Sequence, residues 1–186
     1  MITWHDEFNA DVYDAYAQTY PLYRDTGKRL IELADVHPDM TILDLACGTG
    51  IVTTQISAFG VRETDIIGID SSEAMLAIAR RKLPRSRFFL CRAETISEIL
   101  PASSVDVVVC NAAVWQIPFR RALQELHAVL KPDGRFAFNI NTTSYLIGPA
   151  GSQSLLHLIH QVAENEYGIP PIQMEKPRKK NITISL

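Results

Sequence analysis

The stretch TILDLACGTG at residues 41–50 decides the fold of this 186-residue chain. Its first half is the near-continuous apolar run of a strand that is covered on both faces of a parallel sheet. Gly48 and Gly50 then predict a sharp turn with no side chain projecting over it, and residues 51–58 have the pattern of a helix. A ligand can therefore lie directly on the peptide groups of the turn and face the first amides of that helix.

Two kinds of nucleoside ligand suit such a turn. The dinucleotide fingerprint G-x-G-x-x-G is half present: Gly48 and Gly50 supply the first two glycines and Asp70 follows at the right distance, but Thr53 occupies the third glycine position. Asp44 lies in the turn region, and a carboxylate close to a pyrophosphate costs on the order of several kcal/mol at a low effective dielectric. The same carboxylate attracts a cation. This favours S-adenosylmethionine, which carries an ammonium and a sulfonium group, and leaves a dinucleotide-dependent oxidoreductase as the distant alternative.

Four segments, taken in order, resemble one known family. Residues 44–50 (DLACGTG) resemble motif I of the class I S-adenosylmethionine-dependent methyltransferases, in the D-x-x-C/G-G-T-G form of the small-molecule branch. Residues 68–76 resemble the second strand and its following helix, residues 105–116 the fourth strand, and residues 130–135 the turn before the fifth. The resemblance implies in-line methyl transfer to an O, N or C nucleophile of a small-molecule or carrier-bound substrate, with S-adenosylhomocysteine as product. A protein that binds S-adenosylmethionine without catalysis is the alternative.

Apolar runs and helical patterns alternate along the core of the chain, which predicts an α/β fold. We expect a Rossmann-like, doubly wound, mostly parallel sheet with helices on both faces. The whole chain, 1–186, is expected to form a single domain in which residues 41–140 are the cofactor-binding core. The further expected strands are 66–69, 87–90, 105–109 and 135–139, and the further expected helices run to Lys82, capped by Ser71 or Ser72, and from Phe119 to Leu130.

Residues 1–40 are expected to form a helical segment before the sheet. One helix is predicted over 11–19, ending before Pro21, and a second over 24–36. The first helix is rich in tyrosine, which leaves two interpretations open: ordinary packing, or a lid that closes over cofactor and substrate. The buried stripe of the second is predicted to be Leu30, Ile31, Leu33 and Ala34.

Residues 141–186 are expected to supply a substrate-side helix and a tail. A helix is predicted over 152–166, and the alternating residues 181–186 read as one strand. The resembling family usually completes its sheet with an antiparallel hairpin here. We therefore expect the C-terminal part of the sheet to be incomplete, either because the chain is truncated or because a second copy or another partner chain completes it.

Polar residues that follow each strand define the expected cofactor site. Asp70 offers an acceptor pair for two ribose hydroxyls, and Met75 can lie against the adenine. Where the family often has an acid this chain has Arg92, so Glu94 or the backbone at Ala93 is expected to bind the adenine amino group instead. The predicted cofactor-binding set is Asp44, Ala46, Cys47, Gly48, Gly50, Asp70, Ser71, Met75, Ala93, Glu94, Asn111 and Ala112, with Asn111 and Ala112 facing the methionine part.

Several classes of function and site are disfavoured. The net charge of -3 and pI near 5.9 weigh against a nucleic-acid substrate, as does the lack of the D/N/S-P-P-Y/F/W motif after the fourth strand. Cys47, Cys91 and Cys110 form no close pair, so we expect no metal site and a reduced, cytoplasmic setting. No segment is apolar and long enough for a membrane span. Trp115 and Gln116 are expected to line the pocket mouth, with core packing of Trp115 as the alternative, and no catalytic residue is assigned.

Overall fold

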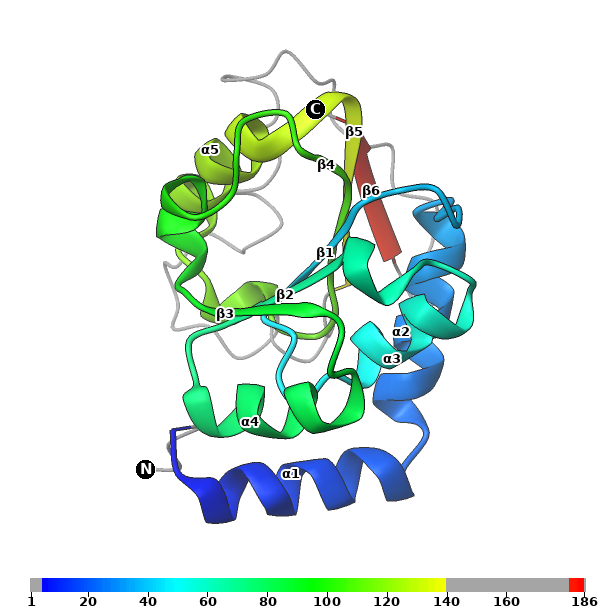
Figure 1. The fold of residues 1–186 in the computed structure, drawn as a ribbon, viewed down its shortest axis with the longest axis vertical. Coiled ribbons are helices and arrows are strands. Elements are labelled where there is room, and N and C mark those ends of the chain that lie inside the picture. The colour runs from blue at the N-terminus through cyan, green and yellow to red at the C-terminus, as the bar shows by residue number, and fades with distance from the viewer. Residues whose placement is uncertain (1–4, 140–180, 186) are drawn as a thin grey trace, which may run out of the picture.

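The computed structural model describes residues 5–139 and 181–185, and helices and strands alternate along the described chain from β1 to β5 (Figure 1). The helix predicted at 152–166 lies outside the described residues. The elements in chain order are α1 (Glu7–Thr19), α2 (Leu22–Leu33), β1 (Ile42–Leu45), α3 (Ile51–Ala58), η1 (Glu63–Asp65), β2 (Ile66–Asp70), α4 (Glu73–Lys82), β3 (Arg87–Leu90), η2 (Ala93–Glu98), β4 (Val105–Cys110), η3 (Val114–Gln116), α5 (Phe119–Val129), β5 (Leu130–Asn139) and β6 (Asn181–Ser185), where η marks a 3-10 helix.

The strands form a single sheet in the order β3-β2-β1-β4-β5-β6. β1 to β5 are parallel, and β6 runs antiparallel to β5. The chain winds from β1 through β2 to β3 on one side and then returns to β4 and β5 on the other, so the winding reverses between β1 and β4. Ligands bind at such a reversal, outside the carboxyl ends of the strands. The predicted mostly parallel, doubly wound α/β fold is confirmed.

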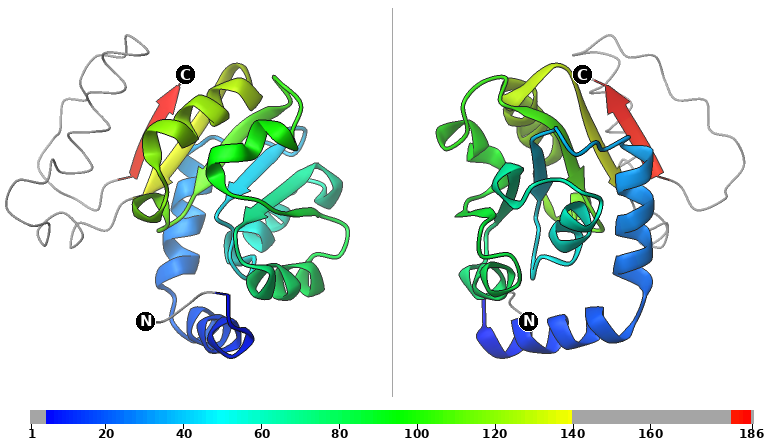
Figure 2. Two further views of the ribbon diagram at one scale, coloured as in Figure 1. Left: turned by 90° about the vertical axis from the view of Figure 1, so that its left-hand side faces the viewer. Right: turned by 45° about the vertical axis from the view of Figure 1, so that its right-hand side comes forward.

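Each face of the sheet carries its own apolar core, as the alternation of side chains along a strand requires. On one face Ile42 of β1 packs with Leu30 and Ile31 of α2 and with Ile56 of α3. On the other face Leu43 and Leu45 of β1 belong to a core that includes the buried residues of α5. Helices therefore cover both faces, as the sequence predicted (Figure 2).

The N-terminal helices differ from their predicted bounds for local reasons. α1 begins earlier than expected because the Asp6 carboxylate caps it, accepting from the amides of Phe8 at 2.9 Å and Asn9 at 3.3 Å. α2 ends at Leu33, and Asp35 just beyond has a left-handed φ of 53°. The prediction that Leu33 is buried is wrong, because its side chain is 39% exposed. At about 100° per residue it lies outside the arc that buries Leu30, Ile31 and Ala34.

α1 lies across α4 at one end of the molecule, and α2 rises from its C-terminal end (Figures 1 and 2). Ala10 of α1 packs against Met75 and Ile78 of α4. Asp14 and Lys82 form an ion pair between the same two helices. These contacts place one side of α1 toward the carboxyl ends of β1 and β2.

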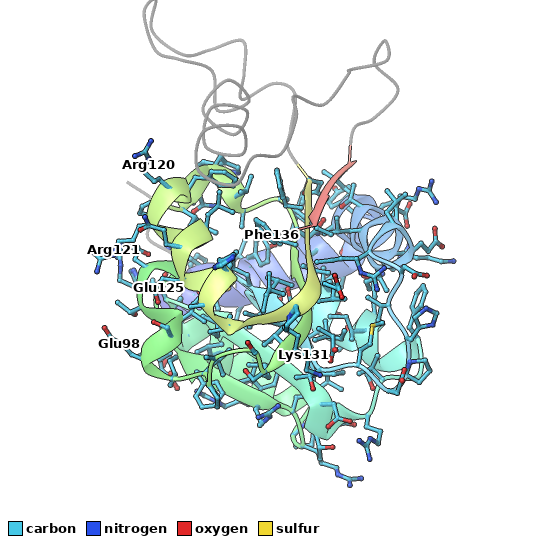
Figure 3. All side chains as sticks on the ribbon, turned by 90° about the horizontal axis from the view of Figure 1, so that it is seen from above. Glu98, Arg120, Arg121, Glu125, Lys131 and Phe136 are labelled. Atoms are coloured by element: carbon cyan, nitrogen blue, oxygen red, sulfur yellow. The ribbon has the colours of Figure 1, made fainter. Side chains whose placement is uncertain are left out.

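α5 and η2 are joined on the opposite side. The carboxylate of Glu125 accepts from both the amide and the hydroxyl of Ser97, at 2.9 and 2.6 Å. Arg120 and Arg121 point away from the molecule at the start of α5 (Figure 3). Lys131 donates to the carboxylate of Asp106 at 2.8 and 2.9 Å, beside a register shift between β4 and β5. β5 begins at Leu130, earlier than the predicted 135, because Leu130 pairs with Val105 of β4 ahead of the register shift.

Candidate functional site

A cavity of about 250 Å³ opens at the carboxyl ends of β1, β2 and β4. We call this cavity the pocket. It lies at the winding reversal of the sheet, where the fold predicts a ligand. Nine of the residues predicted to bind a cofactor line it, namely Ala46, Gly48, Asp70, Ser71, Met75, Ala93, Glu94, Asn111 and Ala112.

Asp70 is the acidic group at the centre of one wall. Its Oδ2 accepts from the amide of Gly48 at 2.9 Å, and its Oδ1 accepts from the amide of Ser72 at 2.9 Å. Both oxygens are thereby fixed in place, and each keeps acceptor capacity for a ligand hydroxyl. Burial raises the pKa of the Asp70 carboxyl, although the bonds from the Gly48 and Ser72 amides oppose that shift.

The turn after β1 brings backbone to the pocket. Ala46 and Gly48 have left-handed φ values of 55° and 54°, and the amide of Cys47 donates to Ile69 of the neighbouring strand at 3.0 Å. Gly50 begins α3 with φ 79°, and a Cβ there would lie 3.1 Å from the Cβ of Ala79. Gly50 thus allows α3 to pack closely on α4, while Gly48 presents its backbone to the pocket.

Three predicted residues lie behind the pocket wall: Asp44, Cys47 and Gly50 do not line it. Asp44 is 1% exposed, and its Oδ2 accepts from the hydroxyl of Thr53 at 2.6 Å. It lies on the same face of β1 as Ile42, which directs its side chain toward α3. Burial raises the pKa of its carboxyl to about 7. The expectation that Asp44 directly repels phosphate as a fixed negative charge is therefore wrong.

Thr53 explains how the third glycine of the dinucleotide fingerprint is replaced. Its side chain is fully buried and satisfies Asp44. A buried carboxyl without a partner would be costly, so this bond stabilises the junction of β1 and α3. In this chain the third glycine position is therefore occupied by a threonine whose hydroxyl makes a buried hydrogen bond.

The wall after β3 combines Ala93 with an ion pair. Arg92 donates to Oε1 of Glu94 through Nε at 2.9 Å and Nη2 at 2.7 Å, and both side chains line the pocket. Ala93 itself is 8% exposed. Arg92, which stands where the resembling family often has an acid, thus fixes the carboxylate of Glu94 at the pocket edge.

The wall after β4 is a turn built around Ala112, which has a left-handed φ of 56°. The indole Nε1 of Trp115 donates to the carbonyl of Ala112 at 3.1 Å. Trp115 is 52% exposed and lines the pocket together with Gln116. The prediction that these residues line the mouth is favoured over the alternative that Trp115 packs in the core.

Two tyrosines from the N-terminal helices also line the pocket. The ring centroids of Tyr13 on α1 and Tyr23 on α2 lie 5.5 Å apart. A Cβ added at Gly48 would lie 3.8 Å from the ring of Tyr13, so Tyr13 sits over the glycine turn. Burial raises the pKa of the Tyr13 hydroxyl, which is therefore neutral at physiological pH. The tyrosine-rich pattern of 11–19 was the only sequence signal for this contact.

Sequence reasoning missed Asn139, the last residue of β5. Its Oδ1 accepts from the amide of Ala112 at 2.5 Å, and its Nδ2 donates to Oδ1 of Asn111. It is 7% exposed. The one signal available was a polar residue that directly follows the apolar run 136–138.

The pocket fits a cationic nucleoside. Asp70 supplies oxygen acceptors, Met75 and Ile69 supply apolar surface, and Asn111 and Ala112 supply amide groups. Asp70, which lines the pocket and accepts from the Gly48 amide, places an acidic group beside the glycine turn, and this suits a sulfonium better than a phosphate.

The model of a family described as a methyltransferase domain matches residues 42–134, from the first residue of β1 into β5. The chain belongs to the class I S-adenosylmethionine-dependent methyltransferases. S-adenosylmethionine is the cofactor of this family. The resemblance predicted from the four sequence segments is thereby confirmed.

Two curated relatives illustrate the substrates of the methyltransferases that this chain resembles. Malonyl-[acyl-carrier protein] O-methyltransferase of Yersinia pestis is 34% identical over 131 residues, which are 70% of this chain and 46% of that protein. Demethylmenaquinone methyltransferase of Symbiobacterium thermophilum is 31% identical over 134 residues, 68% of this chain and 53% of that protein. The chain spans about half the length of these methyltransferases.

A solved structure shows the same fold. The TehB-like methyltransferase from Corynebacterium glutamicum superposes with a TM-score of 0.61 at 19% identity, covering 87% of this chain and 91% of that one. In residues 5–139 and 181–185 of this methyltransferase-family chain, no group of three His, Cys, Asp or Glu side chains could hold a metal. None of the helices in that same part of the chain has the length and apolar character of a membrane span.

Proposed function

We propose that this chain transfers a methyl group from S-adenosylmethionine to a small or carrier-borne acceptor. The observation that carries the proposal is Asp70, whose carboxylate faces the pocket at the end of β2 with both oxygens held by backbone amides. A rigid acceptor pair of this kind suits the two neighbouring hydroxyls of a ribose.

The other walls would hold the remaining parts of the cofactor. Met75 would lie against the adenine, and Glu94 with the Ala93 amide would meet its amino group. Asn111 and Ala112 would bind the methionine part through amide groups. Asp44, Cys47 and Gly50 would support these contacts from behind, because they shape the turn on which Ala46 and Gly48 lie.

The bound cofactor would supply an electrophilic sulfonium methyl. The chain's own task is then to hold a nucleophile in line with that methyl group and to exclude water. The side of the pocket away from β2 is lined by Trp115, Gln116 and Pro118. These residues would shape the acceptor site. Tyr13 would close the pocket as part of a helical lid formed by residues 1–40.

The acceptor class is inferred from the relatives and from charge. One relative methylates a carrier-bound malonyl group and the other a demethylmenaquinone. A net charge of -3 does not favour nucleic acid. We therefore propose a small-molecule or carrier-bound acceptor, in a cytoplasmic setting that suits the three free cysteines.

A partner chain is a further part of this proposal. β6 pairs with β5 and has no neighbour on its other side within the described sheet. An open strand edge can pair with another strand, so a second copy or another chain would complete the sheet there. Sedimentation velocity over a range of concentrations tests this, and a monomer at all concentrations would exclude the second copy.

Calorimetry followed by a methyl-transfer screen tests the function. We expect S-adenosylmethionine and S-adenosylhomocysteine to bind and NAD to show no heat. The screen would offer carboxylic acids, quinols, amines and acyl-carrier substrates, with methylated product detected by mass spectrometry. Binding without turnover on any acceptor would favour the alternative, a binding protein that does not catalyse, and binding of NAD alone would refute both.

A further inference from the structure

Two asparagine side chains and two backbone groups form one continuous hydrogen-bonded relay along the pocket wall. The amide of Ala112 donates to Oδ1 of Asn139 at 2.5 Å, and Nδ2 of Asn139 donates to Oδ1 of Asn111. Nδ2 of Asn111 then donates to the carbonyl of Tyr23 at 3.1 Å. The relay therefore joins the end of β5, the end of β4 and the start of α2.

The two ends of the relay fix its direction. A backbone amide can only donate and a backbone carbonyl can only accept. Asn139 must therefore turn its oxygen toward Ala112, which leaves its NH₂ group for Asn111. Asn111 must in turn present its oxygen to Asn139 and its NH₂ to Tyr23. Rotating either amide would bring two oxygens or two NH₂ groups together and leave buried polar groups unpaired.

Asn139 also holds a strained turn in place. Ala112 has φ 56°, a conformation that residues other than glycine adopt only when their surroundings hold them there. Both polar backbone groups of Ala112 are bonded to side chains, its amide to Asn139 and its carbonyl to Trp115 at 3.1 Å. Asn139 is 7% exposed and does not itself line the pocket.

We propose that Asn139 is a positioning residue for cofactor binding. It sets the orientation of the Asn111 amide, holds the turn at Ala112 and thereby couples the wall after β4 to Tyr23 of α2. This rests on the proposed function, because it takes the pocket as the cofactor site. Asn111 and Ala112 touch the ligand; Asn139 acts through them.

A double-mutant cycle on S-adenosylhomocysteine affinity tests the coupling. We expect Asn139→Ala and Asn111→Ala each to weaken binding about tenfold, and the double variant to weaken it clearly less than a hundredfold, because Asn139 acts in part through Asn111. Two independent residues would instead give about a hundredfold loss, because separate effects multiply. A double variant near a hundredfold would overturn the relay.

An isosteric variant of Asn139 distinguishes a role in orienting the Asn111 amide from a role in packing alone. Asn139→Asp keeps the shape of the side chain, but both oxygens of an ionised carboxylate can only accept. Asn111 must then turn its NH₂ group toward residue 139 and lose its hydrogen bond to the Tyr23 carbonyl. We expect Asn139→Asp at neutral pH to bind more weakly than the wild type, although its oxygen can still accept from the Ala112 amide. If Asn139→Asp binds like the wild type, Asn139 has only a packing role and the proposal fails.

A matched control keeps loss of stability apart from loss of positioning. Phe138, the neighbour of Asn139 on β5, is fully buried, packs on Phe119 and Phe136, and lies outside the pocket. We expect Phe138→Leu to lower the melting temperature with unchanged affinity. Equal loss of affinity in Phe138→Leu and Asn139→Ala would overturn the proposal.

Fluorescence gives a readout without ligand. The chain has two tryptophans, Trp4 and Trp115, so a Trp4→Phe background isolates Trp115. We expect Asn139→Ala to shift the emission of Trp115 in that background, and Phe138→Leu to leave it unchanged. If the wild-type chain binds no S-adenosylhomocysteine, both the proposed function and the positioning role of Asn139 are overturned. If the wild type binds and Asn139→Ala binds equally well, only the positioning role is overturned.

Discussion

Hydrogen bonds that span 2 to 22 positions hold the pocket wall after β1 and β2, whereas those that hold the wall after β4 span up to 88 positions. In the first wall the carboxylate of Asp70 takes amides from Gly48 and Ser72, and the backbone supplies every donor. In the second wall Asn111 and Asn139 supply donors and acceptors through their side chains.

The difference in construction predicts a difference in tolerance. Backbone donors survive most substitutions, so the first wall depends on one carboxylate and on the conformation of one glycine. Side-chain donors are lost with their residues, so the second wall can be weakened at several positions. The variants below test how far the two walls behave as separate units.

The largest effect is expected at Asp70. Removing its carboxylate in Asp70→Ala takes away the acceptors for two hydroxyls, each bond to a charged group contributing about 1.5–3 kcal/mol, which predicts a loss of S-adenosylhomocysteine affinity of at least about a hundredfold. The domain should stay folded by circular dichroism. Exposed Asp39→Ala is the matched control and should bind as the wild type does. Unchanged affinity in Asp70→Ala would remove this residue from the site.

A smaller loss is expected for Gly48→Ala. The left-handed φ of 54° costs an L-residue about 1–2 kcal/mol, and the new methyl group would enter the space above the turn, so calorimetry should show binding weakened about ten- to thirtyfold. Gly60→Ala carries backbone strain at φ 100° away from the pocket. It should lower the melting temperature and leave affinity intact. If both glycine variants bind equally well, the first wall tolerates more than its geometry suggests.

Trp115→Phe tests the outer end of the second wall. It removes the indole donor to the Ala112 carbonyl but keeps an aromatic ring, so a loss of about threefold in affinity is expected from one neutral hydrogen bond at a half-exposed site. The control is Phe59→Leu, which changes a partly exposed aromatic side chain outside the pocket. A loss as large as that of Asp70→Ala would mean that the two walls are not separable.

The smallest expected effect on the pocket comes from Asp44, whose contribution is to stability. Its folded-state pKa of about 7 lies above the unfolded value, so the folded state binds the proton more tightly and the free energy of unfolding falls as pH rises from about 4 to 7, then levels off. Asp44→Asn should abolish that part of the fall and be more stable at pH 8, by at most about 4 kcal/mol. Urea unfolding of both proteins at pH 4.5, 6 and 8 measures the free energy of unfolding. Parallel pH curves for the two proteins would show that Asp44 titrates normally.

The first wall was largely predictable, because its parts are neighbours in sequence. The apolar run, Gly48, and Asp70 at the end of the next strand define a turn and an acceptor whose positions follow from the parallel strand geometry. The direction of the Asp44 side chain was not predicted. Alternation along β1 turns it toward Thr53, a consequence that only becomes visible once the faces of the strand are assigned.

The second wall was predictable only in part. Asn111 and Ala112 were found because they follow a recognisable strand. Asn139 and Tyr23 were not, since an asparagine ending a strand and a tyrosine starting a helix are common on any α/β protein. Their role depends on β5 lying beside β4 and on α2 packing over both, which are long-range contacts without a local signature.

The sequence by itself determined the successive apolar strands, the glycine turn after the first strand and the acid after the second. It also determined the family to which these features belong. It could do so because these features are local and periodic. Only the tertiary structure decided which carboxylate faces the pocket and which faces α3, and which asparagines are joined to Tyr23. The physical reason is that side-chain direction and amide orientation are settled by partners that the fold brings together from distant parts of the chain.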